Sequence, residues 1–459
     1  MLTYDLDRRG KLARYDYLYR CIREDILAGR LTAGEKLPSK RSLASHLQTA
    51  VITVQNAYAQ LEAEGYLYTR EKRGYYVADV ERHPAAPGRA PARSAPQPQR
   101  SWLLDLSSGG SGTEDFPFSV WAKLMRRVLS EEGEALLRAT PPNGADALRR
   151  AIAQHLYRFR GISAAPAQIV VGAGTEYLYN LIVQLLGREA VYGVEDPGYS
   201  KAARIYALGG ARTSPVLVDE GGVSLRSLEM SGAQILHTSP NHQFPTGAVT
   251  PIGRRQSLLR WAEAREGRYI IEDDYDSEFR FTLRPIPTLQ SIDRAGRVIY
   301  VNTFSRTLAP SLRISYMVLP KSLTECYRAQ LGFYSSTVPA MEQYTLARFL
   351  DEGYFEAHIN RMRKSYRAQR DAVIDTILQS PLGEHCRVSG EDAGLHFLLT
   401  IDTKCTDHVL RADAEGRGVR LSFLSDFALR PGSAPQHTLV IHYPGIDLGR
   451  LRSALSILE

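Results

Sequence analysis

One stretch of the chain cannot belong to a packed structure, and it divides the sequence in two. Residues 82–100 read RHPAAPGRAPARSAPQPQR, where proline, alanine and arginine dominate and no hydrophobic periodicity survives. Prolines keep such a stretch extended, and it has too few large apolar side chains to join a core. We therefore expect residues 81–102 to link an N-terminal domain, 1–80, to a much larger body.

The formal net charge of +7 is concentrated at the front of the 459-residue chain. Residues 1–80 hold 4 Lys and 9 Arg against 5 Asp and 5 Glu, a balance of +3, and residues 81–104 add another +3. The remaining 355 residues carry only +1. A basic front and a nearly neutral body favour a protein that binds nucleic acid at one end.

The composition also bounds the compartment. The four cysteines, Cys21, Cys326, Cys386 and Cys405, are scattered without a C-x-x-C pair, which predicts reduced thiols and neither a disulfide frame nor a metal site. No run of about 18 apolar residues occurs, and the start MLTYDLDRRGKLARYDY lacks the apolar segment of a signal peptide. We expect a cytoplasmic protein with no membrane segment and no bound metal.

The first 80 residues show the pattern of three helices and a hairpin. Apolar residues recur at helical spacing in three segments, namely Leu18, Ile22 and Ile26, then Leu43 and Leu47, then Val54, Tyr58 and Leu61. The first helix is expected over 15–28, Ser39 is the expected N-cap of the second, and Gly65 ends the third. Strand-like runs at 66–70 and 75–77 flank a turn at 71–74. This is the winged helix-turn-helix arrangement, which presents its third helix to the major groove of double-stranded DNA.

Basic and amide side chains of this domain are candidates for DNA contact. Cations at a helix start or wing turn meet phosphates, and amide side chains on the third helix reach base edges. The candidates are Lys40, Arg41, Thr53, Gln55, Asn56, Arg70, Lys72, Arg73 and Gly74. The phrases LAGRLTAGEKLPSKRSLASHL and TVQNAYAQLEAEGYLYTREKRGYYV resemble GntR-type regulators. Ala50 and Val51 replace that family's Ser-Arg, and Lys72 replaces its first wing glycine, so the site sequence is expected to differ.

From about residue 103 the pattern becomes short apolar runs separated by helical segments. The runs lie at 167–171, 190–194, 233–238, 268–272 and 297–302. Such alternation predicts a mostly parallel sheet covered by helices on both faces. We expect this α/β large domain to span 103–325. Long helices and the strand-like phrases HFLLTID and HTLVIHY then predict a small C-terminal subdomain over 326–459.

Residues 298–320, VIYVNTFSRTLAPSLRISYMVLP, constrain the chemistry. The segment resembles the stretch that carries the cofactor lysine in fold-type I pyridoxal-phosphate (PLP) enzymes of the aminotransferase class, and Arg306 stands in the lysine slot. A lysine amine can lose its proton and form a Schiff base, whereas a guanidinium stays protonated. With the N-terminal domain, the layout resembles MocR-type transcription regulators of the GntR superfamily. The resemblance implies an aminotransferase fold with no catalytic residues for transamination.

The same resemblance implies a set of cofactor-binding residues. Asp273 follows an apolar run and matches the carboxylate that pairs with the pyridine nitrogen, and Tyr275 matches the tyrosine at the ring hydroxyl. A glycine-rich helix start and an arginine are typical of a phosphate site. The implied set is Gly174, Thr175, Tyr199, His242, Asp273, Tyr275, Thr303, Ser305, Arg306 and Arg313. His242 belongs to the phrase P-N-H-Q-F-P-T-G, whose Phe244 follows the regulator version of the family loop, and Lys201 lies near the same mouth.

Several alternatives stay open at this stage. The late arginine that grips a substrate carboxylate in aminotransferases is absent from LVIHYPG, and Arg420 or Arg430 could substitute. The ligand implied is PLP held non-covalently, a PLP–amino acid adduct or another anionic metabolite, sensed by a homodimer. The rival hypotheses are an active PLP-dependent aminotransferase fused to a DNA-binding domain, which Arg306 opposes, and a ligand-independent DNA-binding dimer, which Asp273 and Tyr275 oppose.

Overall fold

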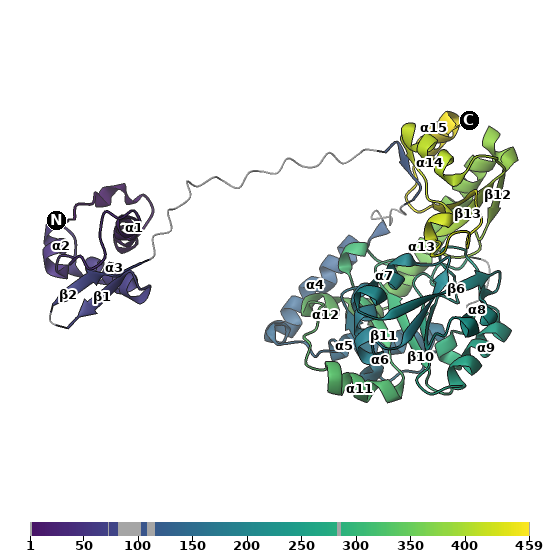
Figure 1. The fold of residues 1–459 in the computed structure, drawn as a ribbon, viewed down its shortest axis with the longest axis horizontal. Helices are drawn as coiled ribbons and strands as arrows, with labels where there is room; N and C mark the ends of the chain where they lie inside the picture. Colours follow the sequence, from purple (N-terminus) through teal and green to yellow (C-terminus); the bar gives the residue numbers. More distant parts are fainter. Residues whose placement is uncertain (1, 72, 81–101, 108–114, 282–285, 459) are drawn as a thin grey trace. The chain divides into compact units, whose positions relative to one another are not determined.

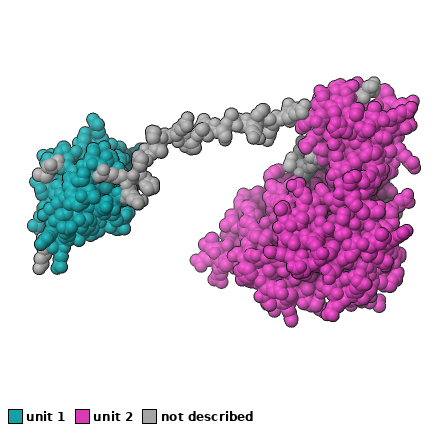
Figure 2. All heavy atoms as spheres, in the orientation of Figure 1, with its two compact units in different colours: residues 1–99 teal, residues 100–459 magenta. Residues whose placement is uncertain are grey.

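The computed structural model describes residues 2–71, 73–80, 102–107, 115–281 and 286–458. The chain divides into two compact units, Met1–Gln99 and Arg100–Glu459, shown in two colours in Figure 2. We call them the winged-helix unit and the large unit. The expected linker falls almost wholly outside the described residues, and so does Lys72.

The winged-helix unit contains the expected three helices and hairpin (Figure 1). They are α1 (Arg14–Leu27), α2 (Lys40–His46), α3 (Val51–Ala63), β1 (Leu67–Arg70) and β2 (Gly74–Val77). Ser39 caps α2, because its side chain accepts from the backbone N–H of Ser42 at 3.1 Å. β1 and β2 pair in antiparallel register from Leu67↔Val77 to Arg70↔Gly74. The winged helix-turn-helix prediction is confirmed, except that Leu47 is the C-cap of α2 and only half-buried.

The large unit is built on an eight-stranded sheet of order β4-β11-β10-β9-β8-β5-β6-β7. The pairs β10–β9, β9–β8, β8–β5 and β5–β6 are parallel, and β11 and β7 run antiparallel to their neighbours. The mostly parallel sheet is therefore confirmed. The strands are β4 (Ile169–Gly172), β5 (Val191–Asp196), β6 (Arg212–Asp219), β7 (Gly222–Val223), β8 (Ile235–Thr238), β9 (Tyr269–Asp273), β10 (Val298–Thr303) and β11 (Ser315–Val318).

Helices cover both faces of this sheet, as the alternation of side chains along the central strands shows. Tyr300 belongs to one buried apolar cluster together with residues of α5, α12 and α13. Its neighbours Ile299 and Val301 belong to a second cluster with residues of α6, α7 and α11. Successive strand residues point to opposite faces, so both faces are buried. The helices are α4 (Phe118–Glu132), α5 (Asp146–Arg160), α6 (Thr175–Leu186), α7 (Ser200–Leu208), α8 (Leu225–Met230), α9 (Ile252–Glu263), α10 (Leu289–Ile292), α11 (Lys321–Leu331), α12 (Ala340–Asp351) and α13 (Tyr354–Leu378).

A second, antiparallel sheet lies in the C-terminal part, in the order β12-β13-β15. Its strands are β12 (Cys386–Ser389), β13 (His396–Ile401) and β15 (Thr438–His442), accompanied by α14 (Asp407–Gly416) and α15 (Leu448–Leu458). β14 (Val419–Arg420) pairs in parallel with β3 (Leu104–Asp105), which brings the start of the large unit to its end. Among the described residues, no helix is both long and apolar enough to cross a membrane.

Candidate functional site: an anion pocket and a DNA-binding face

A cavity of about 320 Å³ opens where β4, β5, β8, β9 and β10 end. Ligands bind at this edge of open α/β sheets, since the loops that follow parallel strands converge there. Nine of the ten predicted cofactor residues line it, and His242 does not. The lining residues are Gly174, Thr175, Glu176, Tyr179, Tyr199, Lys201, Ser239, Phe244, Asp273, Tyr275, Thr303, Ser305, Arg306, Pro310 and Arg313.

Asp273 is anchored on one oxygen and presents the other without a partner. It is the last residue of β9, not just past it, because it still pairs with Val301 of β10. Its Oδ2 accepts from the Tyr179 hydroxyl at 2.5 Å and lies 3.3 Å from His237 Nε2. Its Oδ1 is buried with no hydrogen-bond partner. A buried carboxylate oxygen in this state is costly, so the site favours a ligand that donates a hydrogen bond there.

Asp273 is held in place by Tyr179 and His237, two residues that the sequence analysis missed. His237 lies on β8, and its Nδ1 is 2.6 Å from the Tyr206 hydroxyl. Because the carboxylate only accepts, the consistent arrangement has His237 Nε2–H donating to Asp273 and Tyr206 donating to Nδ1. Burial, with the Asp273 charge next, raises the pKa of Tyr179 well above its usual value, so its hydroxyl stays a donor. The sequence signal that could have indicated this role is a histidine, His237, within an apolar run.

The cavity lining also includes three charged side chains that pair with one another. Arg313 Nη2 lies 2.8 Å from Glu176 Oε2, and Lys201 Nζ lies 2.6 Å from Glu176 Oε1. Arg313 packs directly on Gly174, the N-cap of α6, where an added Cβ would lie 2.5 Å from Nη2. Gly174 also has a φ of +93°, which disfavours other residues. The predicted pair Gly174 and Arg313 therefore meets as expected, but with Glu176 between the cations.

Aromatic rings form another part of the cavity lining. Phe244 lies edge-on to Tyr199 at 6.3 Å and to Tyr275 at 6.3 Å, with interplanar angles of 83° and 89°. Behind Phe244 lie the rings of Phe427, at 4.9 Å, and His396, at 5.3 Å. A flat aromatic ligand could pack against these faces and edges.

The loop that follows β8 is tied down by buried hydrogen bonds, which explains its motif. Asn241 donates to Asp274 at 2.7 Å, and Gln243 donates to Glu195 at 3.1 Å. His242 Nδ1 lies 2.9 Å from Asp276 Oδ2 and 3.1 Å from the Tyr275 hydroxyl. His242 therefore contacts Tyr275 without lining the cavity, and Ser239 and Phe244 are the residues of this loop that line it.

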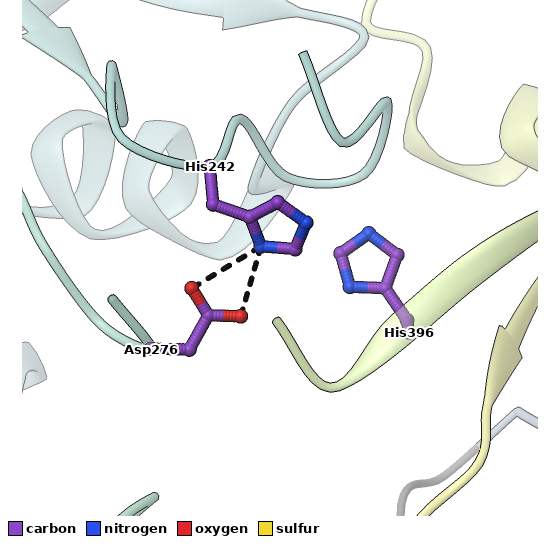
Figure 3. A group of neighbouring side chains, drawn as sticks. All are labelled: His242, Asp276 and His396. Atoms are coloured by element: carbon purple, nitrogen blue, oxygen red, sulfur yellow. Dashed lines mark hydrogen bonds and ion pairs between the residues drawn. The ribbon is translucent and has the colours of Figure 1, made fainter. Parts of the chain in front are cut away.

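Among the described residues, His242, Asp276 and His396 form a cluster of residue types that can bind a metal ion, with one possible ligand atom of each within 4.8 Å of the others (Figure 3). Several of these atoms already have partners. Asp276 is joined to His242 Nδ1 by both oxygens, and His396 Nε2 lies 3.0 Å from the Pro245 carbonyl. His242 Nε2 is buried and without a partner. The backbone at Gly394 presses on the same ring, since a Cβ there would meet His242 Cε1 at 2.0 Å. In this structure hydrogen bonds therefore join His242 to Asp276 and His396 to the backbone at Pro245.

Arg306 lies in the turn after β10 and is exposed, and no described residue forms an ion pair or hydrogen bond with it. Burial, then the Arg306 charge, lowers the pKa of His442 from its usual value to about 4. Lys201 is the one lysine among the lining residues. The hydrogen bond to Glu176 raises the pKa of Lys201, which keeps its amine protonated.

Arg420 and Arg430, the two arginines considered for binding a ligand carboxylate, form ion pairs outside the cavity. Arg430 pairs with the buried Asp196 at 3.1 Å, and Arg420 pairs with Asp105 at 3.4 Å on β14. Neither lines the cavity.

Most of the described candidate residues of the winged-helix unit are exposed. Gln55 and Asn56 on α3 are exposed, as are Arg41 on α2 and Arg73 in the wing turn. Thr53 on α3 and Lys40 at the start of α2 are half-buried, and Lys40 Nζ lies 5.5 Å from the centre of the Tyr75 ring. Gly74 opens β2 with a φ of +104°.

Arg70 is held by aromatic rings of the hairpin. Its guanidinium carbon lies 4.9 Å from the Tyr76 ring centre and 5.6 Å from that of Tyr68. The stacking fixes a cation beside the wing turn without neutralising it.

Comparison with known proteins agrees with the folds of the winged-helix unit and of the large unit. Residues 14–77 match the family of bacterial regulatory proteins described as the gntR family, and residues 103–410 match aminotransferase class I and II. The chain belongs to both families. It is a DNA-binding transcription regulator with an aminotransferase-like domain.

Regulators with the same layout match along nearly their whole length. The HTH-type transcriptional regulator YdeL of Bacillus subtilis is 36% identical over 100% of this chain and 98% of its own. The probable rhizopine catabolism regulatory protein MocR of Rhizobium meliloti is 34% identical, covering 99% and 94%. The pyridoxine biosynthesis regulator PdxR of Corynebacterium glutamicum is 33% identical, covering 95% and 93%. The resemblance to MocR-type regulators is confirmed.

Solved aminotransferases share the fold of the large unit. LysN, the α-aminoadipate aminotransferase of Thermus thermophilus complexed with N-(5'-phosphopyridoxyl)-L-leucine, has a TM-score of 0.67 and 25% identity. The match covers 77% of this chain and 90% of that one. The predicted fold-type I aminotransferase fold is thus confirmed.

Proposed function

We propose that the large unit binds a small, flat, anionic ligand of the PLP class without a covalent bond, and that this ligand modulates DNA binding by the winged-helix unit. The single observation that carries the proposal is Asp273, whose buried Oδ1 has no partner at the floor of the cavity. A protonated pyridine nitrogen would supply the missing donor. The proposal extends from PLP itself to a PLP–amino acid adduct.

The rest of the cavity fits such a ligand. Tyr199, Phe244 and Tyr275 offer aromatic walls to a ring, and Tyr275 offers a hydroxyl at the ring edge. Thr303, Ser305 and the start of α6 offer hydrogen-bond donors to a phosphate beside Arg313. LysN supports this class of ligand, since its structure holds a phosphopyridoxyl amino acid. Bound PLP would supply an electrophilic aldehyde and an electron-withdrawing ring.

No residue of the cavity is suited to attack that aldehyde. By the resemblance of the 298–320 segment, Arg306 takes the place of the lysine of the aminotransferase family, and a guanidinium stays protonated at accessible pH. Lys201 is kept protonated by Glu176, which lies 2.6 Å away. We therefore propose that the unit senses its ligand and does not perform transamination. Arg306 would contact the ligand as a fixed cation at the rim.

The DNA contacts proposed for the winged-helix unit follow from residue type and from position on α2, α3 and the hairpin. Gln55, Asn56 and Thr53 on α3 are proposed to meet base edges. Lys40, Arg41, Arg70, Lys72 and Arg73 are proposed to contact phosphates, with Gly74 shaping the wing.

We also propose that the large unit forms a homodimer. Five large apolar side chains on α4, on α5 and in the segment that joins them are exposed on a single chain, namely Phe118, Leu129, Leu137, Tyr157 and Phe159. A partner subunit would bury such a surface, and two winged-helix units on one dimer suit repeated half-sites. Light scattering of the full chain should give twice its 51.2 kDa mass, and a monomer at micromolar concentration would refute the dimer.

Equilibrium binding tests the ligand proposal. Wild-type protein should take up PLP at one molecule per chain and release it on gel filtration, while Asp273→Asn should lose at least tenfold in affinity, or about 1.4 kcal/mol. Asp402→Asn changes an exposed carboxylate away from the cavity and should bind as wild type does. Affinity for a duplex selected from a random library should shift severalfold when PLP, alone or with amino acids, is added. Equal PLP binding by Asp273→Asn, or no binding to the wild type, would refute the proposal.

A further inference from the structure

Glu176 occupies a place in the cavity where a ligand anion is expected. It lies in the first turn of α6, one residue after Thr175, and its two carboxylate oxygens are divided between two cations. Oε1 is 2.6 Å from Lys201 Nζ and Oε2 is 2.8 Å from Arg313 Nη2. Both cations line the cavity, and Arg313 is the cation best placed for a ligand phosphate, because it packs on the N-cap of the same helix.

The two ion pairs contribute little to folding. The side chains of Glu176, Lys201 and Arg313 are 37%, 55% and 50% exposed, and ion pairs at that exposure are weak. Removing Glu176 would leave no buried group without a partner, because both cations reach solvent. Its position is therefore better explained by the ligand site than by stability.

Charge at this end of the cavity depends on Glu176. Lys201 and Arg313 together carry +2, and Glu176 reduces the sum to +1. A phosphate dianion would have to displace the carboxylate from its cations or share them with it. Like charges that compete for the same donors oppose each other, so the phosphate would bind less tightly than the bare cations allow.

We infer that Glu176 is the specificity-determining residue of the anion position, an internal carboxylate that the phosphate of an incoming ligand must displace from Arg313 and Lys201. The inference rests on the proposed function for its organic ligand, although the anion position itself does not. It makes phosphate recognition weak in the wild-type chain. Because each exposed ion pair is weak, the displacement costs the ligand no more than about tenfold in affinity.

The test compares two ligands that differ only in the phosphate. Pyridoxine 5'-phosphate and pyridoxine have no aldehyde and cannot react with surface lysines. Full-length wild-type protein, Glu176→Gln and Glu176→Ala are titrated with each by calorimetry. Glu352→Gln is the matched control, since Glu352 is paired with Arg127 at 3.0 Å outside the cavity. Both Glu176 variants should raise the affinity ratio of phosphorylated to unphosphorylated ligand severalfold, up to about tenfold, with pyridoxine itself unchanged, and the control should not.

A titration with inorganic phosphate distinguishes failure of the proposed function from failure of the inference about Glu176. If no variant binds either pyridoxine compound, the proposed function fails. Stronger stabilisation of Glu176→Gln than of wild type by inorganic phosphate, read as a larger rise in Tm, would still support the inference. An unchanged or lower affinity ratio, or equal stabilisation by phosphate in both proteins, would overturn it. A phosphate effect equal in Glu352→Gln and Glu176→Gln would also overturn it, because the gain would then reflect net charge alone.

Discussion

Gln55 and Asn56 of the winged-helix unit are exposed, and no described residue holds their side chains. Asp273 of the large unit is 6% exposed and is gripped by Tyr179 and His237. The first surface is laid out by one helix and a hairpin. The second is assembled from segments up to 139 residues apart, from Gly174 to Arg313. Residues of the first kind can be substituted without loss of fold, whereas a buried pocket residue such as Asp273 contributes to stability and to binding together.

The largest expected effect lies in the winged-helix unit. Changing Arg70, Lys72 and Arg73 to Glu should abolish DNA binding, a loss of more than about 1,000-fold, because three phosphate contacts become repulsive and counterion release is lost. The salt dependence of residual binding should flatten. Gel-shift titration at two salt concentrations measures both.

Measuring the PLP affinity of the same triple variant extends the comparison between the two units. PLP affinity should stay at the wild-type value, because the two units are separate compact bodies. Changing Arg226, Arg265 and Arg452 to Glu alters exposed arginines of the large unit by the same charge and should leave DNA binding close to normal. Unchanged DNA affinity in the wing variant would break the assignment.

Asp273→Ala should affect stability and binding at once. The Tyr179 hydroxyl and the His237 imidazole would lose their acceptor in a buried place, at about 1–3 kcal/mol for each unsatisfied group. Urea unfolding should show the loss, and PLP binding should vanish. DNA affinity in the absence of ligand should stay within about twofold of wild type, since Asp273 and the DNA-binding residues belong to different compact units. A variant with wild-type stability would contradict the network around Asp273.

Acid should destabilise the large unit through His442. Burial, then the Arg306 charge, lowers the pKa of His442 from 6.5 to about 4. Between those values the unfolded chain binds a proton that the folded chain does not, so stability falls as pH drops from about 6.5 towards 4 and is constant above. The full shift corresponds to at most roughly 3 kcal/mol. His442→Asn should lose this part of the acid sensitivity in urea unfolding at pH 7.5 and 4.5, whereas the exposed His408→Asn should retain it.

Gly174→Ala should give the smallest effect. A φ of +93° and a Cβ placed 2.5 Å from Arg313 Nη2 require the guanidinium to move, at about 1–2 kcal/mol of stability. Phosphate-containing ligands should lose affinity, and unphosphorylated pyridoxine should not. Calorimetry with the two ligands measures the difference, and equal losses for both would place Arg313 outside the anion position.

Local patterns were enough to predict most of the fold. The spacing of Leu18, Ile22 and Ile26 predicted α1, and the apolar run at 297–302 predicted β10. Nine of the pocket residues were found because the family motif places them. Tyr179, His237 and Glu176 were not, because a tyrosine and a glutamate on α6 and a histidine on β8 become partners of Asp273, Lys201 and Arg313 only when the strands have packed.

The role of His242 could not be predicted for the same reason. Its motif indicated a cofactor contact, and the structure puts its ring behind Tyr275, against Asp276. The β8 loop carries that motif because Asn241 and Gln243 satisfy buried carboxylates on neighbouring elements. The predicted cofactor contact of His242 stays a prediction.

Borohydride reduction in the presence of PLP tests the central claim, that this pocket holds its ligand without a covalent bond. Wild-type protein should show no pyridoxyl mass on any peptide of residues 298–320 or on Lys201, while Arg306→Lys should gain a coloured adduct at position 306, because Asp273, Tyr275, Thr303, Ser305 and Arg313 would already surround the ring. A pyridoxyl group on Lys201 of the wild type, or an Arg306→Lys protein that stays colourless and unmodified, would contradict the account.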